Sequence, residues 1–334
     1  MNKLKFAIAG YGKMGKIREK TIRDSFHAEL THIFDISKEF EELNHSKKCD
    51  SFDEILDSDV DAIIVSTTVR SAPEYVISAL KKGKHVLCEK PPAINAEKLL
   101  EVMDVEKKSN KVLKYGFNHR FHYSVLEAKK KILDGALGKV LWMRGVYGKA
   151  GSIDFHKNWR NYKKFSGGGI LIDQGIHMLD LFRFLSEDEF DCIHSVLSTS
   201  FWDIECEDNA FITLQSKKGT IATLHSSATQ WKHKFLLEIC LENGYLTLDG
   251  ILSSTGSYSP EKLIVGMREF EDITFAMGKP REIVTYFEND DSWKLELEEF
   301  ISAIKKKGSI DNGTSEDALK IMQLTDQIYS NFDK

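Results

Sequence analysis

The sequence contains no uninterrupted run of about 18 apolar residues, and this absence excludes a membrane-spanning helix. Its first residues, Met1–Leu4, lead directly into a strand-like pattern, without the apolar stretch and cleavage site of a secretory signal peptide. The five cysteines are odd in number, and none stands at the spacing of a metal site. We therefore expect reduced thiols, a cytoplasmic location and no bound metal.

An excess of charge of one sign is also missing. Lysine and arginine number 46 against 51 aspartates and glutamates, so the net charge is only -5, and no dense basic stripe is present. This argues against nucleic acid as a partner. One modest basic segment, 156–164, would suit the phosphate or carboxylate of a small ligand, but it fits a solvated loop equally well. Internal repeats and low-complexity tracts are absent.

The first 118 residues alternate short apolar runs with helix-like segments. Such runs, without polar alternation, are typical of parallel strands covered on both faces. Pro73 and Gly83 bracket one predicted helix, and Asn95 begins another that ends near Lys108. The pattern predicts a doubly wound α/β sheet. The apolar runs are Leu4–Ala9, Leu30–Phe34, Ala62–Val65, His85–Cys88 and Val112–Phe117.

From about residue 119 the pattern changes. A predicted helix, Tyr123–Leu133, precedes a strand-like segment, Val140–Tyr147, and two further helices are predicted over 292–307 and 315–332. Consecutive strands rich in β-branched and aromatic residues predict a largely antiparallel open sheet in an α+β domain, residues 119–334. These strands are Asn209–Gln215, Thr220–Ala228, Phe235–Leu241 and Tyr245–Leu248.

Gly10, Gly12 and Gly15 stand in a Gly-x-Gly-x-x-Gly pattern between the first strand and a predicted helix. Asp35 lies 20 residues beyond Gly15 at the end of the second strand, where a carboxylate binds the adenosine ribose. The glycines permit a tight turn, close approach to a pyrophosphate and close helix packing, and the pyrophosphate rests on the helix N-terminus. A purely structural turn is the alternative. Strand, helix and acid together favour dinucleotide binding.

Asp35 also favours NAD over NADP. Its carboxylate accepts hydrogen bonds from ribose hydroxyls and repels the 2′-phosphate of NADP at close range. Ser37 and Lys38 follow at once, and a hydroxyl and an ammonium can hold a phosphate, so use of NADP stays possible.

Two segments carry candidate catalytic groups. Lys90, in Cys88-Glu89-Lys90-Pro91-Pro92, follows a strand at the edge where open α/β sheets bind ligands. Burial can lower a lysine pKa enough for proton transfer, although a lysine before proline is more often surface charge.

In the segment 167–180, Asp173 and His177 are four residues apart on a predicted helix face. There they can bind a sugar hydroxyl and share its proton, although a lone apolar-helix histidine is more often a core residue. The glycines at 167–169 would let the backbone approach a ligand.

Taken together, these motifs resemble the glucose–fructose oxidoreductase / inositol dehydrogenase / rhizopine-catabolism (Gfo/Idh/MocA) family over nearly the whole length. The resemblance implies a Rossmann domain, 1–118, followed by a substrate-binding and oligomerisation domain, 119–334, whose open sheet often mediates homodimers or homotetramers. It implies NAD(P)-dependent hydride transfer to or from a hydroxyl carbon of a sugar, cyclitol or sugar nucleotide. The matching segments are the glycine turn, 83–91, Asn118–Phe121, Trp159–Arg160 and 167–177.

The resemblance also implies site residues. Lys90, Asp173 and His177 form the catalytic group, with either Lys90 or His177 carrying the proton. Arg120, Trp159 and Arg160 join these three in binding substrate. Cofactor contacts are implied for Gly10, Gly12, Lys13, Met14, Gly15, Asp35, Ser37, Ser66, Thr67, Glu89, Lys90 and Asn118. One departure is the loop after the fourth strand, where many relatives have Thr-Pro-Asn followed by a histidine. This chain has Thr67-Thr68-Val69, with Ala72 at the histidine position, so only Ser66 and Thr67 are assigned to the cofactor there.

Two other functions fit the same motifs. One is a glycosidase that oxidises its sugar transiently, eliminates the aglycone and re-reduces the product with the same cofactor. The other is a non-catalytic sugar or dinucleotide sensor, against which the joint presence of Lys90, Asp173 and His177 argues, since a binding module has no need of all three.

Overall fold

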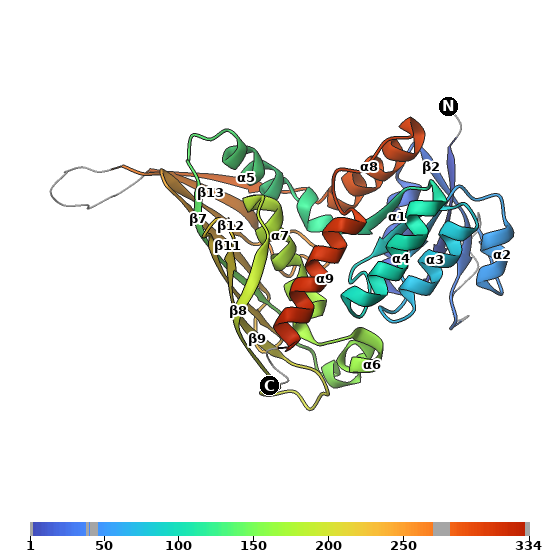
Figure 1. Ribbon diagram of the computed structural model, residues 1–334, viewed down its shortest axis with the longest axis horizontal. Helices are drawn as coiled ribbons and strands as arrows, with labels where there is room; N and C mark the ends of the chain where they lie inside the picture. Colours follow the sequence, from blue (N-terminus) through green and yellow to red (C-terminus); the bar gives the residue numbers. More distant parts are fainter. Residues whose placement is uncertain (1–2, 38–39, 41–45, 270–280, 331–334) are drawn as a thin grey trace. The chain divides into compact units, whose positions relative to one another are not determined.

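The computed structural model describes residues 3–37, 40, 46–269 and 281–330, and the chain forms two compact units (Figure 1). The first unit comprises Met1–Asn118, Lys164–Gly167 and Trp293–Gln323, and the second comprises His119–Lys163, Gly168–Ser292 and Leu324–Lys334. The first change of unit follows Asn118. The return of the chain to the first unit near its end was not predicted.

The first unit is a parallel sheet in the order β3-β2-β1-β4-β5-β6, in which helices connect β1 to β2, β3 to β4, β4 to β5 and β5 to β6. The predicted doubly wound parallel sheet is confirmed. This strand order is that of dinucleotide-binding doubly wound folds. The strands are β1 (Leu4–Ala9), β2 (Ala28–Phe34), β3 (Lys47–Lys48), β4 (Ala62–Val65), β5 (His85–Glu89) and β6 (Leu113–Gly116). The helices are α1 (Lys13–Arg23), α2 (Phe52–Asp57), α3 (Ala72–Lys81) and α4 (Ala96–Ser109).

Local chemistry accounts for the ends of these helices. The Asn95 side chain accepts a hydrogen bond from the backbone N–H of Lys98 at 3.0 Å and caps α4. Pro73 lies in the first turn of α3, and Gly83 follows the helix at φ +73°, a conformation that favours glycine. Both predicted helix boundaries are confirmed.

Helix α8 (Ser292–Lys306) brings the chain back to the first unit. Its Leu297, Phe300 and Ile301 pack in one buried cluster with residues of β1 such as Phe6. The apolar stripe of an amphipathic helix predicts that one face is buried, but it does not name the surface that covers it. For this reason the sequence alone placed α8 with the second domain. Helix α9 (Ser315–Ser330) follows, and the predicted end of this helix at residue 332 lies outside the described residues.

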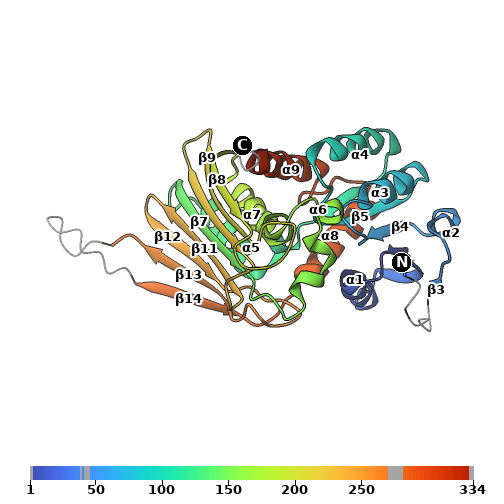
Figure 2. The same cartoon turned by 90° about the horizontal axis from the view of Figure 1, so that it is seen from below.

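The second unit is built on an eight-stranded sheet in the order β14-β13-β12-β11-β7-β10-β9-β8 (Figure 2). All neighbours are antiparallel except β7 and β10, which confirms the largely antiparallel prediction. The strands are β7 (Val140–Gly148), β8 (Phe190–Ser198), β9 (Asn209–Ser216), β10 (Ile221–Ser227), β11 (Lys234–Leu241), β12 (Gly244–Asp249), β13 (Glu261–Met267) and β14 (Glu282–Phe287).

One face of this sheet is covered by helices α5 (Tyr123–Leu133) and α7 (Ile176–Ser186) (Figure 1). Within the part of the chain that the structure describes, no helix lies over the opposite face. We call this opposite side the uncovered face. Among the helices of the described residues, none combines the length and apolarity that crossing a bilayer requires.

Candidate functional site

The glycine turn of the first unit packs against the end of a neighbouring strand. Gly10 has φ +93°, and a Cβ there would lie 2.6 Å from the carbonyl carbon and oxygen of Ser66. A Cβ on Gly15 would collide with the carbonyl oxygen of Gly10. The Ser66 hydroxyl donates a hydrogen bond to the same Gly10 oxygen at 2.6 Å. Glycine is therefore required at positions 10 and 15 by the packing of the turn itself.

Gly12 has a different role, because its surroundings are open. It stands at the N-cap of α1, and a Cβ there would meet nothing within 4 Å. Among the described residues, no side chain caps this end of α1, and its first turn holds no acidic residue. The first backbone N–H groups of α1, at Lys13 and Met14, are thus left to an anion, which the helix dipole also favours. This end of α1 fits the pyrophosphate of a dinucleotide.

The Asp35 carboxylate stands at the end of β2 beside this turn. One oxygen accepts the backbone N–H of Tyr11 at 2.5 Å, and the other accepts the N–H of Ser37 at 2.8 Å. The carboxylate is therefore fixed next to the glycine turn, as a ribose ligand would have to be. The competing candidate, Lys38, lies outside the described residues.

Lys90 directly follows β5, at the carboxyl edge of the parallel sheet, and is partly buried. The peptide bond between Lys90 and Pro91 is cis. Ser66 and Thr67 follow β4 at the same edge, and the buried Asn118 follows β6. The sheet thus brings these predicted residues to the edge where open α/β sheets bind ligands.

Glu89 differs from the sequence-based expectation. Its carboxylate accepts a hydrogen bond from Nε of Arg18 at 2.5 Å, and Nη2 of Arg18 donates to Glu296 of α8 at 2.5 Å. Arg18 and Glu296 are fully buried. Buried charges are stable only when paired, so this arrangement anchors the turn before Lys90, and the proposed contact of Glu89 with a cofactor stays a prediction.

In the second unit, Asp173 lies in a π-helical turn, Leu171–Gly175, that leads into α7. The single α-helix predicted over Asp173 and His177 is therefore corrected. One Asp173 oxygen accepts a hydrogen bond from Nζ of Lys149 at 3.3 Å, and the other forms an ion pair with Nε of Arg160, also at 3.3 Å. The Arg160 guanidinium also lies 4.5 Å from the centre of the Trp159 ring. The structure thus brings the predicted Asp173, Trp159 and Arg160 together and adds Lys149.

His177 lies in the first turn of α7 and is buried, with 4% of its surface exposed. Its ring stacks on the ring of His119, with centroids 3.6 Å apart and planes inclined by 17°. Nε2 of His119 lies 2.9 Å from the Tyr147 hydroxyl. Burial raises the pKa of Tyr147 well above its usual value, so this phenol stays neutral at physiological pH.

Neither His119 nor Tyr147 was predicted as a site residue, and Lys149 was missed as well. His119 lies in the segment Asn118–Phe121 that carried the family resemblance, which was an available signal. Tyr147 and Lys149 lie at the end of β7 and carry no local motif. Only the pairing of β7 with its neighbours brings them to α7.

Internal packing requires glycine at two of the positions before Asp173. A Cβ on Gly168 would collide with the Tyr329 ring, and a Cβ on Gly169 would collide with Glu207. The Glu207 carboxylate accepts the N–H groups of Gly169 and Leu171 at 2.9–3.0 Å, and the Tyr329 hydroxyl at 2.8 Å. These contacts fix the start of the turn that carries Asp173.

Arg120 contacts α7. The sequence assigned it to the substrate, but its side chain is 4% exposed and forms a two-pronged ion pair with Asp180 of α7, at 2.8 and 2.6 Å. Both donors of this pair face the carboxylate, so the guanidinium holds α7 in place. A structural role is the better account.

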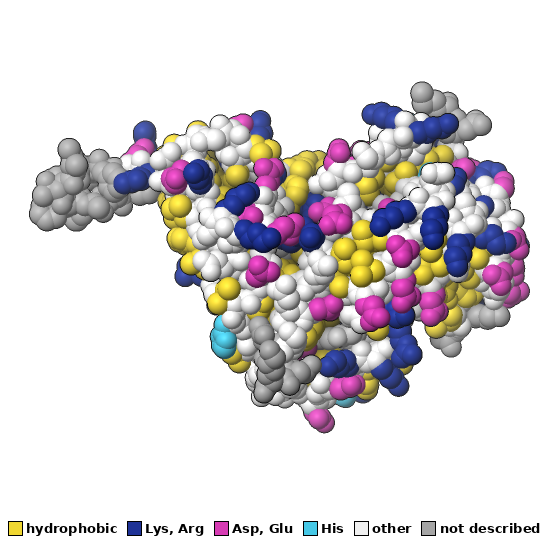
Figure 3. Space-filling view, in the orientation of Figure 1, with side chains coloured by type: hydrophobic (Ala, Val, Ile, Leu, Met, Phe, Trp, Pro, Cys, Tyr) yellow, Lys and Arg dark blue, Asp and Glu magenta, His cyan; other side chains and the backbone are white. Residues whose placement is uncertain are grey.

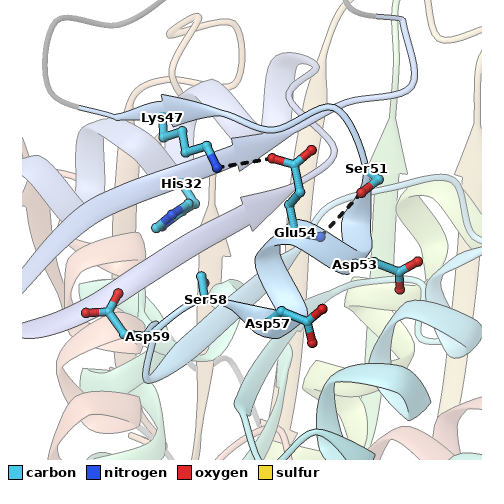
Figure 4. A pocket seen from close by; sticks show the side chains of 8 residues that line it. All are labelled: His32, Lys47, Ser51, Asp53, Glu54, Asp57, Ser58 and Asp59. Carbon is cyan, nitrogen blue, oxygen red and sulfur yellow. Dashed lines mark hydrogen bonds and ion pairs between the residues drawn. The ribbon is translucent and has the colours of Figure 1, made fainter.

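A separate hollow of about 520 Å³ opens on the first unit beside α2 (Figure 4). Its charges are partly paired, with Lys47 and Glu54 3.2 Å apart. Several of its residues precede β4, whereas ligands of such sheets bind at the opposite, carboxyl ends. No group of three or more His, Cys, Asp or Glu among the described residues is arranged for a metal ion. The lining residues are His32, Lys47, Ser51, Asp53, Glu54, Asp57, Ser58 and Asp59.

Comparison with known proteins adds a family. Residues 4–117 match the model "Oxidoreductase family, NAD-binding Rossmann fold", and residues 125–247 match the model "GFO/IDH/MocA C-terminal domain". The chain is 37% identical over 145 residues to levoglucosan dehydrogenase of Pseudarthrobacter phenanthrenivorans, which is 43% of this chain and 37% of that protein. It is 32% identical over 184 residues to D-glucoside 3-dehydrogenase of Escherichia coli K12, which is 50% of this chain and 52% of that protein. The aligned parts thus span about half or less of these relatives.

Other matches are longer but weaker. Myo-inositol 2-dehydrogenase of Thermotoga maritima is 25% identical over 313 residues, 90% of this chain and 88% of that protein. Among solved structures, levoglucosan dehydrogenase in complex with NADH superimposes with a TM-score of 0.85 at 22% identity, covering 99% of this chain and 97% of that one. At 22% identity, this structural similarity shows that the two proteins share a fold and no more.

Proposed function

Because the chain belongs to the Gfo/Idh/MocA oxidoreductase family, we propose that it is a nicotinamide-dependent dehydrogenase or reductase. It moves a hydride to or from a hydroxyl carbon of a sugar, cyclitol or sugar nucleotide. The observation that supports this best is the buried group of His177, His119 and Tyr147 in the second unit. The same unit contains Asp173. The first unit offers an open binding site for an anion at Gly12, at the N-terminus of α1. The named activities of the relatives, on levoglucosan, glucosides and inositol, agree with this substrate class.

The cofactor is NAD or NADP, which accepts or donates the hydride when bound. The turn at Gly10 and Gly12 and the first N–H groups of α1 hold its pyrophosphate. Asp35 holds the adenosine ribose, and the backbone at Ser66 and Thr67 borders the same edge of the sheet.

Three side chains act on the substrate. Lys90 contacts the reacting hydroxyl and stabilises the negative charge that develops on its oxygen. Either His177 or Lys90 exchanges the hydroxyl proton, and the His177 ring is kept in orientation by His119. Asp173 binds a substrate hydroxyl while Lys149 and Arg160 hold its carboxylate in place. Which of Lys90 and His177 carries the proton is a question for their pH profiles.

The experiment that tests this function has two stages. Thermal stabilisation by sugars, cyclitols and sugar nucleotides in the presence of NAD identifies a substrate, because ligands that bind only the folded state raise its stability. Formation of NADH with that substrate then supports a dehydrogenase. Release of an aglycone without net NADH indicates a glycosidase, and binding without either product indicates a sensor. Each of the last two results would overturn the proposal.

Replacing Asp35 with serine is expected to shift cofactor preference from NAD toward NADP. The charge that repels the 2′-phosphate is then gone, while the introduced hydroxyl can still donate a hydrogen bond to it. Because Asp35 also holds the Tyr11 N–H, Asp35→Asn is the control, since it keeps an acceptor for Tyr11 and removes only the charge. Titration of both cofactors into the three proteins measures the shift. Tighter binding of NADP than NAD by the unmodified protein would contradict this role of Asp35.

We also propose that the protein is a cytoplasmic homodimer or homotetramer assembled through the uncovered face. Large apolar side chains on this face are strongly exposed, among them Phe211 at 51% and Trp142 at 41%. Figure 3 shows hydrophobic side chains along the margin that this sheet forms in that view. Exposed apolar patches of this kind mark interaction sites. A monomeric mass in sedimentation would contradict the assembly.

The five cysteines, all free, fit a reducing compartment and support the proposed cytoplasmic location.

A further inference from the structure

Four aromatic residues gather on the loops at one end of the second unit's sheet. Phe155 follows β7, Phe201 and Trp202 lie between β8 and β9, and Trp231 lies between β10 and β11. Ring centroids are 4.9 Å apart for Phe155 and Trp202, 5.1 Å for Phe201 and Trp202, and 4.7 Å for Phe201 and Trp231. Phe201 remains 62% exposed and Trp231 60% exposed. We call these four residues the aromatic platform. Leaving such large rings in water forgoes burial energy that folding would otherwise gain.

The fold nevertheless holds the platform in place. The fully buried Asp208 carboxylate accepts the backbone N–H groups of Ser200, Phe201 and Trp202 at 2.8–3.0 Å. The Trp202 indole N–H donates to the carbonyl of Ala228 at 2.9 Å. Two loops are therefore tied together beneath rings that stay exposed. Ordering these loops in advance removes an entropic cost that a flexible surface would meet on binding.

Gly151 is a second feature that fixes the position of the aromatic platform. It has φ +74°, and a Cβ at this position would collide with the Trp202 ring. Only glycine lets the indole lie directly on the backbone of the loop after β7. That loop also carries Lys149, which brings the platform close to the candidate site.

The platform is continuous with the residues proposed to bind substrate. Nζ of Lys149 lies 5.6 Å from the centre of the Phe155 ring and 3.3 Å from the Asp173 carboxylate. Phe155 in turn packs against Trp202. The path from Asp173 to the platform therefore runs through two side-chain contacts, all within the second unit.

We propose that the aromatic platform binds a second sugar ring, so that the substrate is a disaccharide or a longer glycoside and not a free monosaccharide. This rests on the proposed function and narrows its substrate class. The C–H face of a pyranose is apolar and matches an exposed aromatic ring, while its hydroxyls stay in water.

Charge argues against a sugar nucleotide as the occupant. Three cations near the path are already paired with carboxylates. Lys149 and Arg160 pair with Asp173, and Lys157 pairs with Asp154 at 2.9 Å. A diphosphate would have to displace these partners. An uncharged sugar ring does not.

The test compares kcat/KM for cellobiose with kcat/KM for glucose, or for the pair of mono- and disaccharide that the enzyme turns over. Trp231→Ala and Phe201→Ala are each expected to lower this ratio about five- to tenfold, since one aromatic stacking contact contributes about that factor. Trp231→Phe should keep most of the ratio. Phe26→Ala, which changes a 90% exposed phenylalanine of the first unit, is the matched control.

Each other outcome overturns the proposal in its own way. An unchanged ratio in both alanine variants removes the subsite while leaving the proposed function intact. A selective loss of activity on a sugar nucleotide makes the platform a site for a nucleobase. A lower mass of Trp231→Ala in sedimentation makes it an interface between copies. If the wild type turns over no sugar, the proposed function fails, and cellobiose titration followed by tryptophan fluorescence in wild type and Phe201→Ala still decides whether the platform binds.

Discussion

Alanine at Lys90 or at His177 is expected to lower turnover by about two or more powers of ten, because each change removes acid–base or electrostatic stabilisation of the transition state. The loss should appear in kcat and in kcat/KM alike, as it does when an interaction made mainly in the transition state is removed. Affinity for NAD should change little, since Gly12 and Asp35 carry the proposed cofactor contacts. Steady-state kinetics and cofactor titration measure both quantities.

Two controls separate chemistry from structure in this experiment. His177→Gln keeps a planar polar group against the His119 ring and should lose nearly as much activity as His177→Ala, whereas a packing role would be rescued. Lys82→Ala removes an exposed lysine of the same unit as Lys90, paired with Asp57 on the surface, and should be silent. Near wild-type turnover in both Lys90→Ala and His177→Ala would show that the catalytic assignment is wrong.

The sequence predicts the elements that are buried on both faces most closely. The apolar runs Leu4–Ala9 and Ala62–Val65 coincide with β1 and β4. A strand covered by helices on both sides must be apolar throughout, so its bounds are visible in composition. The strand β14 (Glu282–Phe287) is mostly exposed and was not predicted, because an edge strand with little burial leaves no such signal.

Part of the candidate site was also predictable. Gly10, Gly12, Gly15 and Asp35 stand at fixed spacing in one βαβ unit, and the structure gives them the surroundings that the spacing implies. Their arrangement depends on short-range geometry. A resemblance in motif was enough to find them.

The partners of charged residues were not predictable, because they come from distant segments. Glu89 is held by Arg18, 71 residues away, and the Asp173 turn is fixed by Glu207. The motif showed that an acid or a base recurs at a position, but not which opposite charge it meets. For this reason the sequence did not show that Arg18 and Asp180 pair with Glu89 and Arg120. A buried ion pair and a ligand contact select the same residue types.

Arg120 offers the sharpest test of that distinction. Arg120→Met is expected to lower the free energy of unfolding of the second unit by about 3–5 kcal/mol, because it leaves the Asp180 carboxylate, 1% exposed, buried without its partner. Urea unfolding followed by tryptophan fluorescence reports mainly on this unit. Four of the five tryptophans lie in it, namely Trp142, Trp159, Trp202 and Trp231.

The double variant Arg120→Met/Asp180→Leu shows whether the loss comes from the unpaired charge. Replacing both members of a buried pair with apolar side chains of similar size is often neutral, so this variant should regain most of the lost stability. It should also keep substrate KM close to the wild-type value, since the guanidinium faces Asp180 and not a ligand. A single Arg120→Met variant that unfolds like the wild type but has a raised KM would return Arg120 to the substrate. The same double-mutant cycle would then measure no coupling between Arg120 and Asp180.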